Sequence, residues 1–304
     1  MPARSIHYAL SLGGALCAGA LGLAAYTTRA LNSSPRRPHD EYTLSPWELQ
    51  VDFETVRFET ADGVGLSGWW LARPAARTTV IVLSGRRGMK HQFLGIGAAL
   101  WRAGHNVLLF DYRACGQSEC ARSSLAYYEM QDVQAAIAYA RQRLPDAGIG
   151  LLGYSMGASL AILATAAEPR IQSVIADSPF ATMRDVIAGT YRHYHLPARP
   201  LLNLADALSG WCYGYSFDAV RPLDVIDRIA PRPLLLIHGA EDRTIPVDHA
   251  HRLYAAAGSG TDLRIIDGAQ HCGGYYLDRA GYIRDVTGFF AATLSAPESV
   301  AAHG

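Results

Sequence analysis

Gly153-Tyr154-Ser155-Met156-Gly157 is the most informative stretch of this chain for predicting its fold. The apolar run 149–152 before it is typical of a short buried strand, and the Ala- and Leu-rich run 158–167 after it is typical of a helix. A Gly-x-Ser-x-Gly pattern is common by itself, but at a strand-to-helix junction it predicts a sharp, strained turn that exposes the serine hydroxyl. The two glycines fit this interpretation because a larger side chain would crowd the bend.

Two later loops supply the groups that a reactive serine requires. Asp242 lies in the loop after the apolar strand predicted at 233–237, and His271 lies in the loop after the strand predicted at 263–266. The chain order Ser155, Asp242, His271 is one in which a nucleophile, an orienting acid and a base are found. Parallel α/β sheets bind ligands at the carboxyl ends of their strands, so the three loops are expected to meet at one edge.

Four further motifs are spread over residues 50 to 295. They are Asp62-Gly63-Val64-Gly65-Leu66-Ser67-Gly68-Trp69, Asp111-Tyr112-Arg113-Ala114-Cys115-Gly116-Gln117-Ser118, Asp177-Ser178-Pro179-Phe180 and His238-Gly239-x-x-Asp242. With the serine turn, they resemble the α/β-hydrolase superfamily, and within it the Bem46-like and serine-aminopeptidase-like hydrolases. The resemblance implies an α/β-hydrolase fold, with a mostly parallel central sheet flanked by helices and a small lid insertion.

The same resemblance implies a role for each site residue. Ser155 would be the nucleophile, His271 the base and then the acid, and Asp242 the group that orients His271. The backbone N–H of Met156 would be one donor of the oxyanion hole. The backbone N–H of Arg86, in the loop after the strand predicted at 79–83, would be the second donor.

Four residues near this site leave alternatives open. Ser84 stands where the family usually has a histidine, which concerns the rigidity of the loop because the donor is main chain. Asp177 is a rival to Asp242, since some members of the family take the acid from that earlier strand. The side chains of Arg86 and Arg87 could meet an anionic substrate, although a solvated loop is the ordinary interpretation of such a pair.

Composition narrows the function further. Lys plus Arg and Asp plus Glu each number 27, so the formal net charge is zero and gives no electrostatic case for a nucleic-acid partner. Neither a dinucleotide-binding nor a Walker phosphate loop is present in the sequence, and no Cys or His cluster has zinc spacing. His249 and His251 lie two positions apart on a predicted helix and do not share a face. We therefore expect no cofactor and no metal.

Regular alternation of elements supports the α/β class. The sequence predicts strands at 51–60, 64–73, 79–83, 106–110 and 171–176, and helices at 91–102, 128–143 and 282–294. Between 180 and 221 the alternation lapses, and this interval corresponds to the lid of the family. It is rich in aromatic residues, namely Tyr191, Tyr194, Trp211, Tyr213, Tyr215 and Phe217. We expect them either to form a hydrophobic acyl pocket or to pack the lid onto the sheet.

The N-terminus is a second informative region. From Ser5 to Thr28, 24 residues contain no Asp, Glu, Lys or Arg, which is long enough for a helix to span a bilayer. We expect an uncleaved single-pass anchor; the alternative is a signal segment that is removed on export. The basic residues Arg29, Arg36 and Arg37 outnumber Arg4 and the amino terminus, and narrowly favour a cytoplasmic catalytic domain.

The expected organisation has four parts. Residues 1–31 form the anchor or signal segment, 32–49 a linker, 50–296 the α/β-hydrolase domain and 297–304 a tail. Cys115, Cys120, Cys212 and Cys272 would allow two disulfides or remain thiols.

The chain is thus expected to be a membrane-anchored serine hydrolase acting on a small or lipid-like ester, thioester or amide through an acyl-Ser155 intermediate. An acyltransferase on the same fold and a catalytically silent binding module are the alternatives.

Overall fold

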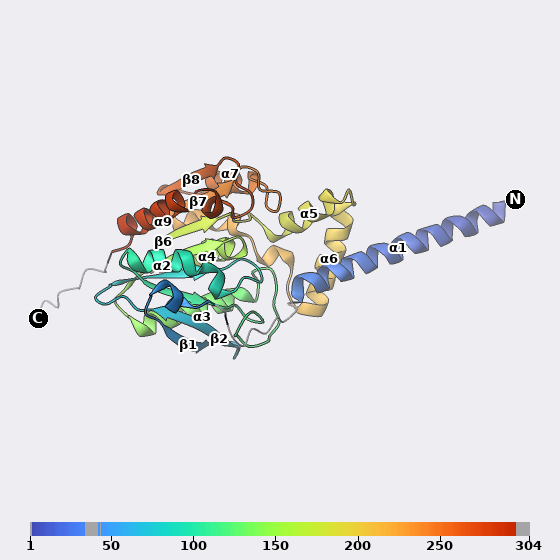
Figure 1. Cartoon of the computed structure of the whole chain (residues 1–304). Helices are drawn as coiled ribbons and strands as arrows, with labels where there is room; N and C mark the ends of the chain where they lie inside the picture. Colours follow the sequence, from blue (N-terminus) through green and yellow to red (C-terminus); the bar gives the residue numbers. More distant parts are fainter. Residues whose placement is uncertain (1, 34–41, 43, 296–304) are drawn as a thin grey trace, which may run out of the picture.

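The computed structural model describes residues 2–33, 42 and 44–295, and within them eight strands form one central sheet (Figure 1). The strands are β1 (Glu54–Glu59), β2 (Gly65–Leu71), β3 (Thr78–Leu83), β4 (Asn106–Phe110), β5 (Gly148–Tyr154), β6 (Ile171–Asp177), β7 (Leu234–Gly239) and β8 (Thr261–Ile266). Their order is β1-β2-β4-β3-β5-β6-β7-β8. β1 and β2 pair antiparallel, and β3 to β8 are parallel, so the mostly parallel α/β sheet is confirmed.

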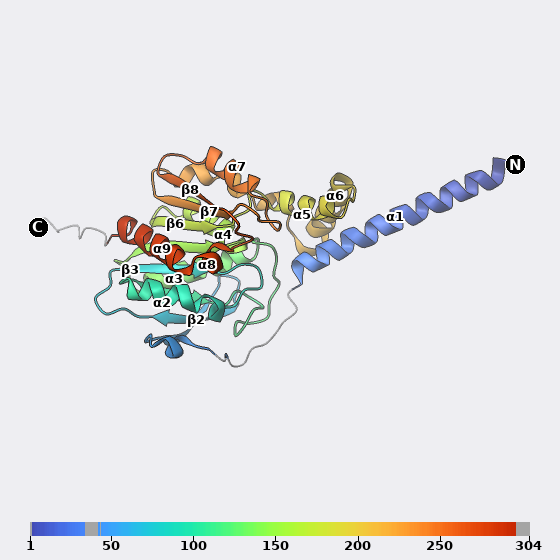
Figure 2. The ribbon, with the colours of Figure 1, turned by 45° about the horizontal axis from the view of Figure 1, so that its top comes forward.

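Helices cover both faces of this sheet. They are α2 (Leu94–Arg102), α3 (Glu129–Arg143), α4 (Met156–Ala167), α7 (Asp248–Ala256), α8 (Gly274–Leu277) and α9 (Arg279–Thr293), and a short 3-10 turn, η2 (Lys90–Phe93), precedes α2. Side chains of β4 show how the two faces separate, because strand side chains alternate in direction. Val107 and Leu109 pack in one core with α2 and α9, and Leu108 and Phe110 pack in the other with α3 and α4. Figure 2 shows α2 and α9 over the first of these faces.

All five residues of β4 are buried, as are all of β5. A strand that is covered on both faces is apolar throughout, which explains why continuous apolar runs predicted these elements well. Burial of each large aliphatic side chain stabilises the fold by about 1.5–3 kcal/mol. The central strands therefore form a rigid base for the loops at their carboxyl ends.

A helical cap follows β6 and lies within the interval expected for the lid. It consists of α5 (Met183–His193) and α6 (Ala198–Tyr213). The last turns of the N-terminal helix α1 (Pro2–Asn32) pack against it. The Thr28 hydroxyl donates to the carbonyl oxygen of Ala205 at 2.9 Å, and the hydroxyl groups of Tyr191 and Thr27 are 2.8 Å apart.

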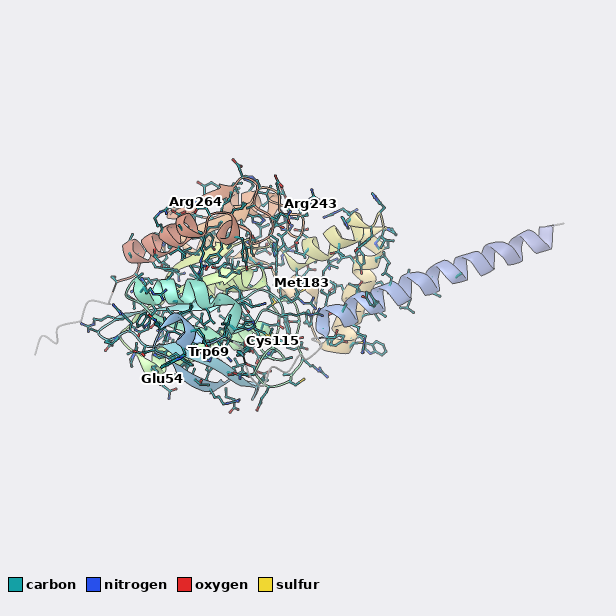
Figure 3. The ribbon with its side chains drawn as sticks, viewed as in Figure 1. Glu54, Trp69, Cys115, Met183, Arg243 and Arg264 are labelled. Atoms are coloured by element: carbon teal, nitrogen blue, oxygen red, sulfur yellow. The ribbon has the colours of Figure 1, made fainter. Side chains whose placement is uncertain are left out.

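The other end of α1 leaves the domain and projects away from it (Figure 1). Met183 and Cys115 lie on the side of the domain from which α1 projects, and Glu54 lies on the opposite side (Figure 3). The expected N-terminal helix is therefore present. Across the described part of the chain, however, no helix is both long and apolar enough to cross a membrane, so the expected transmembrane helix has no support here. Half of the expected linker, at 34–41 and 43, and the expected tail at 297–304 lie outside the described residues.

Candidate active site

Ser155 sits in a strained turn between β5 and α4. Its φ and ψ are 54° and −118°, a conformation that L-residues rarely adopt outside functional sites. The flanking glycines make it possible. A Cβ on Gly157 would lie 2.2 Å from the carbonyl oxygen of Leu83, and a Cβ on Gly153 would lie 2.3 Å from the carbonyl oxygen of Gly157. The turn is therefore wedged against the end of β3.

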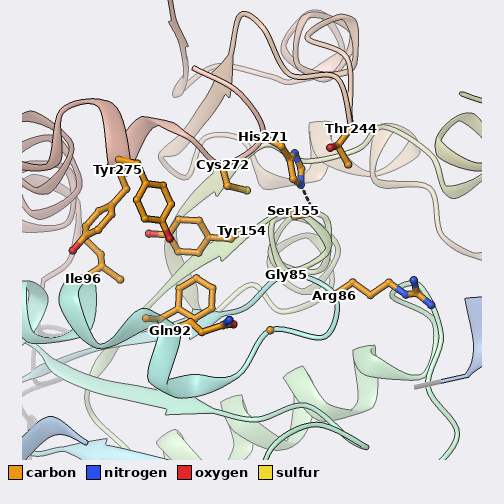
Figure 4. Close-up of a pocket in the computed structure, with 13 residues that line it drawn as sticks. Gly85, Arg86, Gln92, Ile96, Tyr154, Ser155, Thr244, His271, Cys272 and Tyr275 are labelled. Carbon is orange, nitrogen blue, oxygen red and sulfur yellow. Dashed lines mark hydrogen bonds between the residues drawn. The ribbon is translucent and has the colours of Figure 1, made fainter. Parts of the chain in front are cut away.

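The structure brings Ser155, His271 and Asp242 together from three strand ends. Ser155 Oγ lies 2.8 Å from His271 Nε2 (Figure 4). His271 Nδ1 lies 2.7 Å from Asp242 Oδ2. With the imidazole proton on Nδ1, the ring donates to the carboxylate and accepts from the serine hydroxyl. This is the geometry in which a histidine can remove the proton of a serine.

Asp242 is held as a carboxylate. Burial alone would raise its pKa, but hydrogen bonds from His238, His271 and the backbone N–H of Ile245 outweigh burial and hold the pKa well below its usual value. Its second oxygen, Oδ1, accepts from the backbone N–H groups of Thr244 and Ile245 at 2.8 and 2.9 Å. A carboxylate so fixed keeps its charge and its direction toward His271.

Asp177, the rival acid, has other partners. Its carboxylate accepts from Tyr282 at 2.7 Å and from Ser178 at 2.9 Å. It is fully buried, and burial raises its pKa despite those hydrogen bonds. Its contacts fix the end of β6 against α9, while the imidazole of His271 bonds to Asp242.

The expected oxyanion-hole residues lie on either side of Ser155. Met156 is the first residue of α4, a position whose backbone N–H has no acceptor within the helix. In the loop after β3, a Cβ on Gly85 would lie 3.4 Å from the Cβ of Ser155, and Arg86 is the next residue of this loop. The Arg86 side chain points away from Ser155 (Figure 4). Arg86 and Arg87 donate to carbonyl oxygens at and just beyond the end of α1. Arg86 is half-buried, whereas Arg87 is exposed, so the interpretation as a solvated loop holds for Arg87 alone.

A pocket of about 620 Å³ opens beside Ser155 and His271. Its walls come from the segment after the loop that follows β3, from the end of β5 and from the segment after His271. The residues are Gln92, Phe93, Ile96, Tyr154, Cys272, Tyr275 and Tyr276. Residue-by-residue reasoning missed Phe93, Ile96 and the two tyrosines. Their signal was position, because each follows a predicted catalytic loop within about ten residues.

The aromatic residues of the cap are absent from this lining, so the expectation that they form the pocket is wrong. Tyr215 stacks on Tyr127 with ring centroids 4.4 Å apart, and Phe217 is buried in the core. Trp211 and Tyr194 are exposed by 85% and 66%. The alternative, that the aromatics pack the cap onto the domain, holds for the buried ones.

The remaining candidates have structural surroundings. His238 Nε2 lies 2.8 Å from the carbonyl oxygen of Ile245 and 3.3 Å from Asp242, directly under the acid loop. His249 Nδ1 accepts from the backbone N–H of Ala181 at 3.0 Å. Among the described residues, no cluster of His, Cys, Asp and Glu could hold a metal ion. Cys120 is a free thiol, so it forms no disulfide with Cys115, and Cys212 and Cys272 are free thiols as well.

Comparison with known proteins shows the family to which this chain belongs. The model of the alpha/beta hydrolase fold matches residues 78–196. An uncharacterised Bacillus subtilis protein, YqkD, is 33% identical over 251 residues, which are 79% of this chain and 80% of that protein. The chain belongs to the α/β-hydrolase superfamily. An uncharacterised Escherichia coli K12 protein, YfhR, is 30% identical to this α/β hydrolase over 85% of this chain and 86% of its own length.

Two further likenesses carry more informative names. The α/β-hydrolase domain-containing protein WAV2 of Arabidopsis thaliana is 26% identical over 81% of this chain and 80% of its own. Among solved structures, the Pyrococcus furiosus esterase Pf2001 superposes on this α/β hydrolase with a TM-score of 0.70 at 25% identity, covering 85% of this chain and 97% of that one.

Proposed function

We propose that this α/β hydrolase is a serine hydrolase that cleaves an acyl ester, thioester or amide. The observation that carries the proposal is the continuous hydrogen-bonded line from Ser155 through His271 to Asp242 beside an open pocket. The likeness to an esterase agrees with it. No specific observation favours acyl transfer to another acceptor, and the assembled line argues against a silent binding module.

In the proposed reaction, His271 Nε2 takes the proton of Ser155 as Oγ attacks the acyl carbon. Asp242 orients the imidazole and stabilises its positive charge. The backbone N–H groups of Met156 and Arg86 donate to the oxygen that becomes negative. His271 then gives its proton to the leaving group, and the acyl-Ser155 bond is hydrolysed by a water that His271 deprotonates.

The pocket lining supports an apolar acyl group. Phe93, Ile96 and Tyr275 line the space next to Ser155. Figure 4 shows Ile96 and Tyr275 in this lining. The proposed hydrophobic acyl site is thus formed by η2, α2 and α8, and not by the aromatic residues of the cap. It fails if acetyl esters turn over better than medium-chain esters.

The first test is labelling by a fluorophosphonate probe, applied to the full chain and to Ser155→Ala in detergent. We expect the wild type to label and to hydrolyse medium-chain esters. Ser155→Ala should lose labelling and lower kcat by at least about 10³-fold while melting like the wild type, because only the nucleophile is removed. An unlabelled, well-folded wild type would refute the proposal.

We further propose that α1 attaches the protein to a lipid bilayer. Residues 17–19, Leu21 and Gly22 are exposed, and the run from Ser5 to Thr28 has no Asp, Glu, Lys or Arg. An apolar helix that projects into water needs a cover. We expect the protein to stay with membranes after alkaline carbonate extraction, and recovery in the soluble fraction would refute this.

A further inference from the structure

The loop after β3 is tied to the C-terminal end of α1. Arg86 Nη2 donates to the carbonyl oxygens of Ala30 and Leu31 at 2.5 and 3.0 Å, and Arg87 Nη2 donates to that of Ser33 at 3.0 Å. The last carbonyls of a helix have no partner within it, and the helix dipole favours a cation at this end. The Arg86 guanidinium therefore holds the last turn of α1, and Arg87 bonds only to the residue beyond the helix.

The same loop borders the nucleophile. Gly85 is in van der Waals reach of Ser155, and Arg86 is the next residue. On its far side the loop is closed by a hydrogen bond from Gly88 N–H to the Gly85 carbonyl oxygen at 2.9 Å, and then by the buried ion pair between Lys90 and Asp111 at 2.7 Å. The backbone of Arg86 is thus held on two sides. The Gly88 and Lys90 contacts fix the chain after it, and α1 binds the guanidinium of its own side chain.

The end of α1 is itself fixed by the cap. Ala24 is buried, Thr28 donates to the carbonyl oxygen of Ala205, and Asn32 Nδ2 donates to the carbonyl oxygen of Thr28 at 2.8 Å. The Arg86 side chain is largely removed from water, and this burial lowers the pKa of its guanidinium. A buried cation in contact with helix carbonyls has little freedom to move, which makes the connection stiff.

We propose that Arg86 is a positioning residue: its guanidinium, clamped on the last carbonyls of α1, sets the place of its own backbone N–H beside Ser155. The inference rests on the proposed function, in which that N–H faces the developing oxyanion. It makes α1 a part of the active site, because a displaced α1 would let the donor drift. Hydrogen-bond donation to an oxyanion is sensitive to such drift.

The contacts also decide against a substrate-binding role for this arginine. The Arg86 head is on the side of the loop away from the pocket and is occupied by two carbonyl oxygens (Figure 4). A substrate anion would have to displace those bonds. The two roles differ in kinetics, because a positioning residue changes kcat and an anion-binding residue changes KM.

The test compares Arg86→Met with Arg87→Met in the full chain. Methionine keeps an unbranched apolar stem and the backbone N–H, and it removes every side-chain donor. Arg87 serves as the matched control because it is exposed and bonds only beyond the helix end. We expect Arg86→Met to lower kcat for a medium-chain ester about 10- to 100-fold, a part of what loss of an oxyanion donor costs, with KM changed less than about twofold. Arg87→Met should change kcat less than about threefold.

A second variant tests the path through α1. Thr28→Val removes the hydroxyl that bonds the cap, at a residue that does not line the pocket. We expect it to lower kcat about threefold or more in the wild-type background and to have no further effect in Arg86→Met, because coupled residues are not additive. Additive effects, equal kcat for the two arginine variants, or an effect of Arg86→Met on KM alone would each overturn the inference.

Hydrogen exchange separates this inference from the proposed function. If α1 clamps the loop, Arg86→Met will speed exchange of the backbone amides at 84–88, and Arg87→Met will do so less. This readout requires no turnover, so an inactive wild type would refute the hydrolase proposal while the clamp is still tested. Equal exchange in both variants and the wild type would refute the clamp.

Discussion

At the scale of single residues, two buried carboxylates stand at neighbouring strand ends and their partners decide what each can do. Asp242 receives two backbone N–H groups and an imidazole, which hold its pKa low. Asp177 receives two hydroxyl groups in a fully buried place, and its pKa is raised. Only the first is suited to face an imidazolium, because only the first keeps its negative charge readily.

Asp242→Asn should therefore lower kcat about 10³- to 10⁴-fold, since an amide no longer fixes the tautomer of His271 or stabilises its charge. Asp177→Asn, the matched control, should cost thermal stability and leave kcat within about tenfold. Steady-state kinetics and melting curves of both variants check this. A folded Asp177→Asn that is the worse catalyst would move the acid to β6.

At the scale of elements, the pocket is built by the segments that follow the catalytic loops. The η2 turn and α2 continue from the loop after β3, and α8 continues from the loop of His271. The cap contributes no lining residue among those described, because its inner side packs on the domain and its outer side meets α1. Chain-length preference should therefore be set by α2 and α8.

Ile96 offers a test of this division. It is 3% exposed and lines the pocket, so Ile96→Phe should fill the space available to the acyl chain, and Ile96→Val is the matched control that empties it slightly. We expect Ile96→Phe to lower the kcat/KM ratio of octanoyl to butanoyl ester by about 10-fold or more, in the range that pocket size imposes on methylene groups. An unchanged ratio in a folded variant would show that the acyl chain lies elsewhere.

Much of this architecture could be predicted from the sequence. β4 has the bounds expected for it, and α4 begins two residues before the expected 158. Ser155, Asp242 and His271 could be placed at one sheet edge because parallel strands end together. The pocket walls and the docking of α1 could not be placed, since they depend on which way Phe93, Tyr275 and Arg86 point, and local patterns do not determine this.

At the scale of the whole molecule, zero net charge conceals an uneven distribution. Residues 1–39 contain no Asp or Glu, and neither do residues 186–205 at the turn between α5 and α6. That turn exposes Arg192, His193, Tyr194 and His195, and Arg199 follows at the start of α6. It lies at the side of the domain from which α1 projects (Figure 1). If α1 attaches the protein to a bilayer as proposed above, this basic and aromatic surface beside it favours anionic lipids.

This arrangement predicts a lipid-dependent protection. In the protein reconstituted in vesicles, amides at 192–200 should exchange more slowly with phosphatidylglycerol than with phosphatidylcholine alone. The double variant Arg192→Glu and Arg199→Glu should abolish the difference, because each basic residue near an anionic surface is worth about 1 kcal/mol. Arg57→Glu, at an exposed position of β1, is the control and should keep the difference between the two lipids. Equal exchange in both lipids would refute the contact.

The contacts of α1 also bear on how the chain is made. Thr28 and its partner Ala205 are 177 positions apart, whereas Arg86 and Ala30 are 56 apart. At a synthesis rate of about 5–20 residues per second, the cap emerges about 9–35 s after the helix that it holds. Among the described hydrogen bonds of α1 to the rest of the chain, those from Arg86 can form during that interval. A cellular factor that binds nascent apolar segments can therefore contact α1 before the cap has been synthesised. The cap then packs on α1 afterwards.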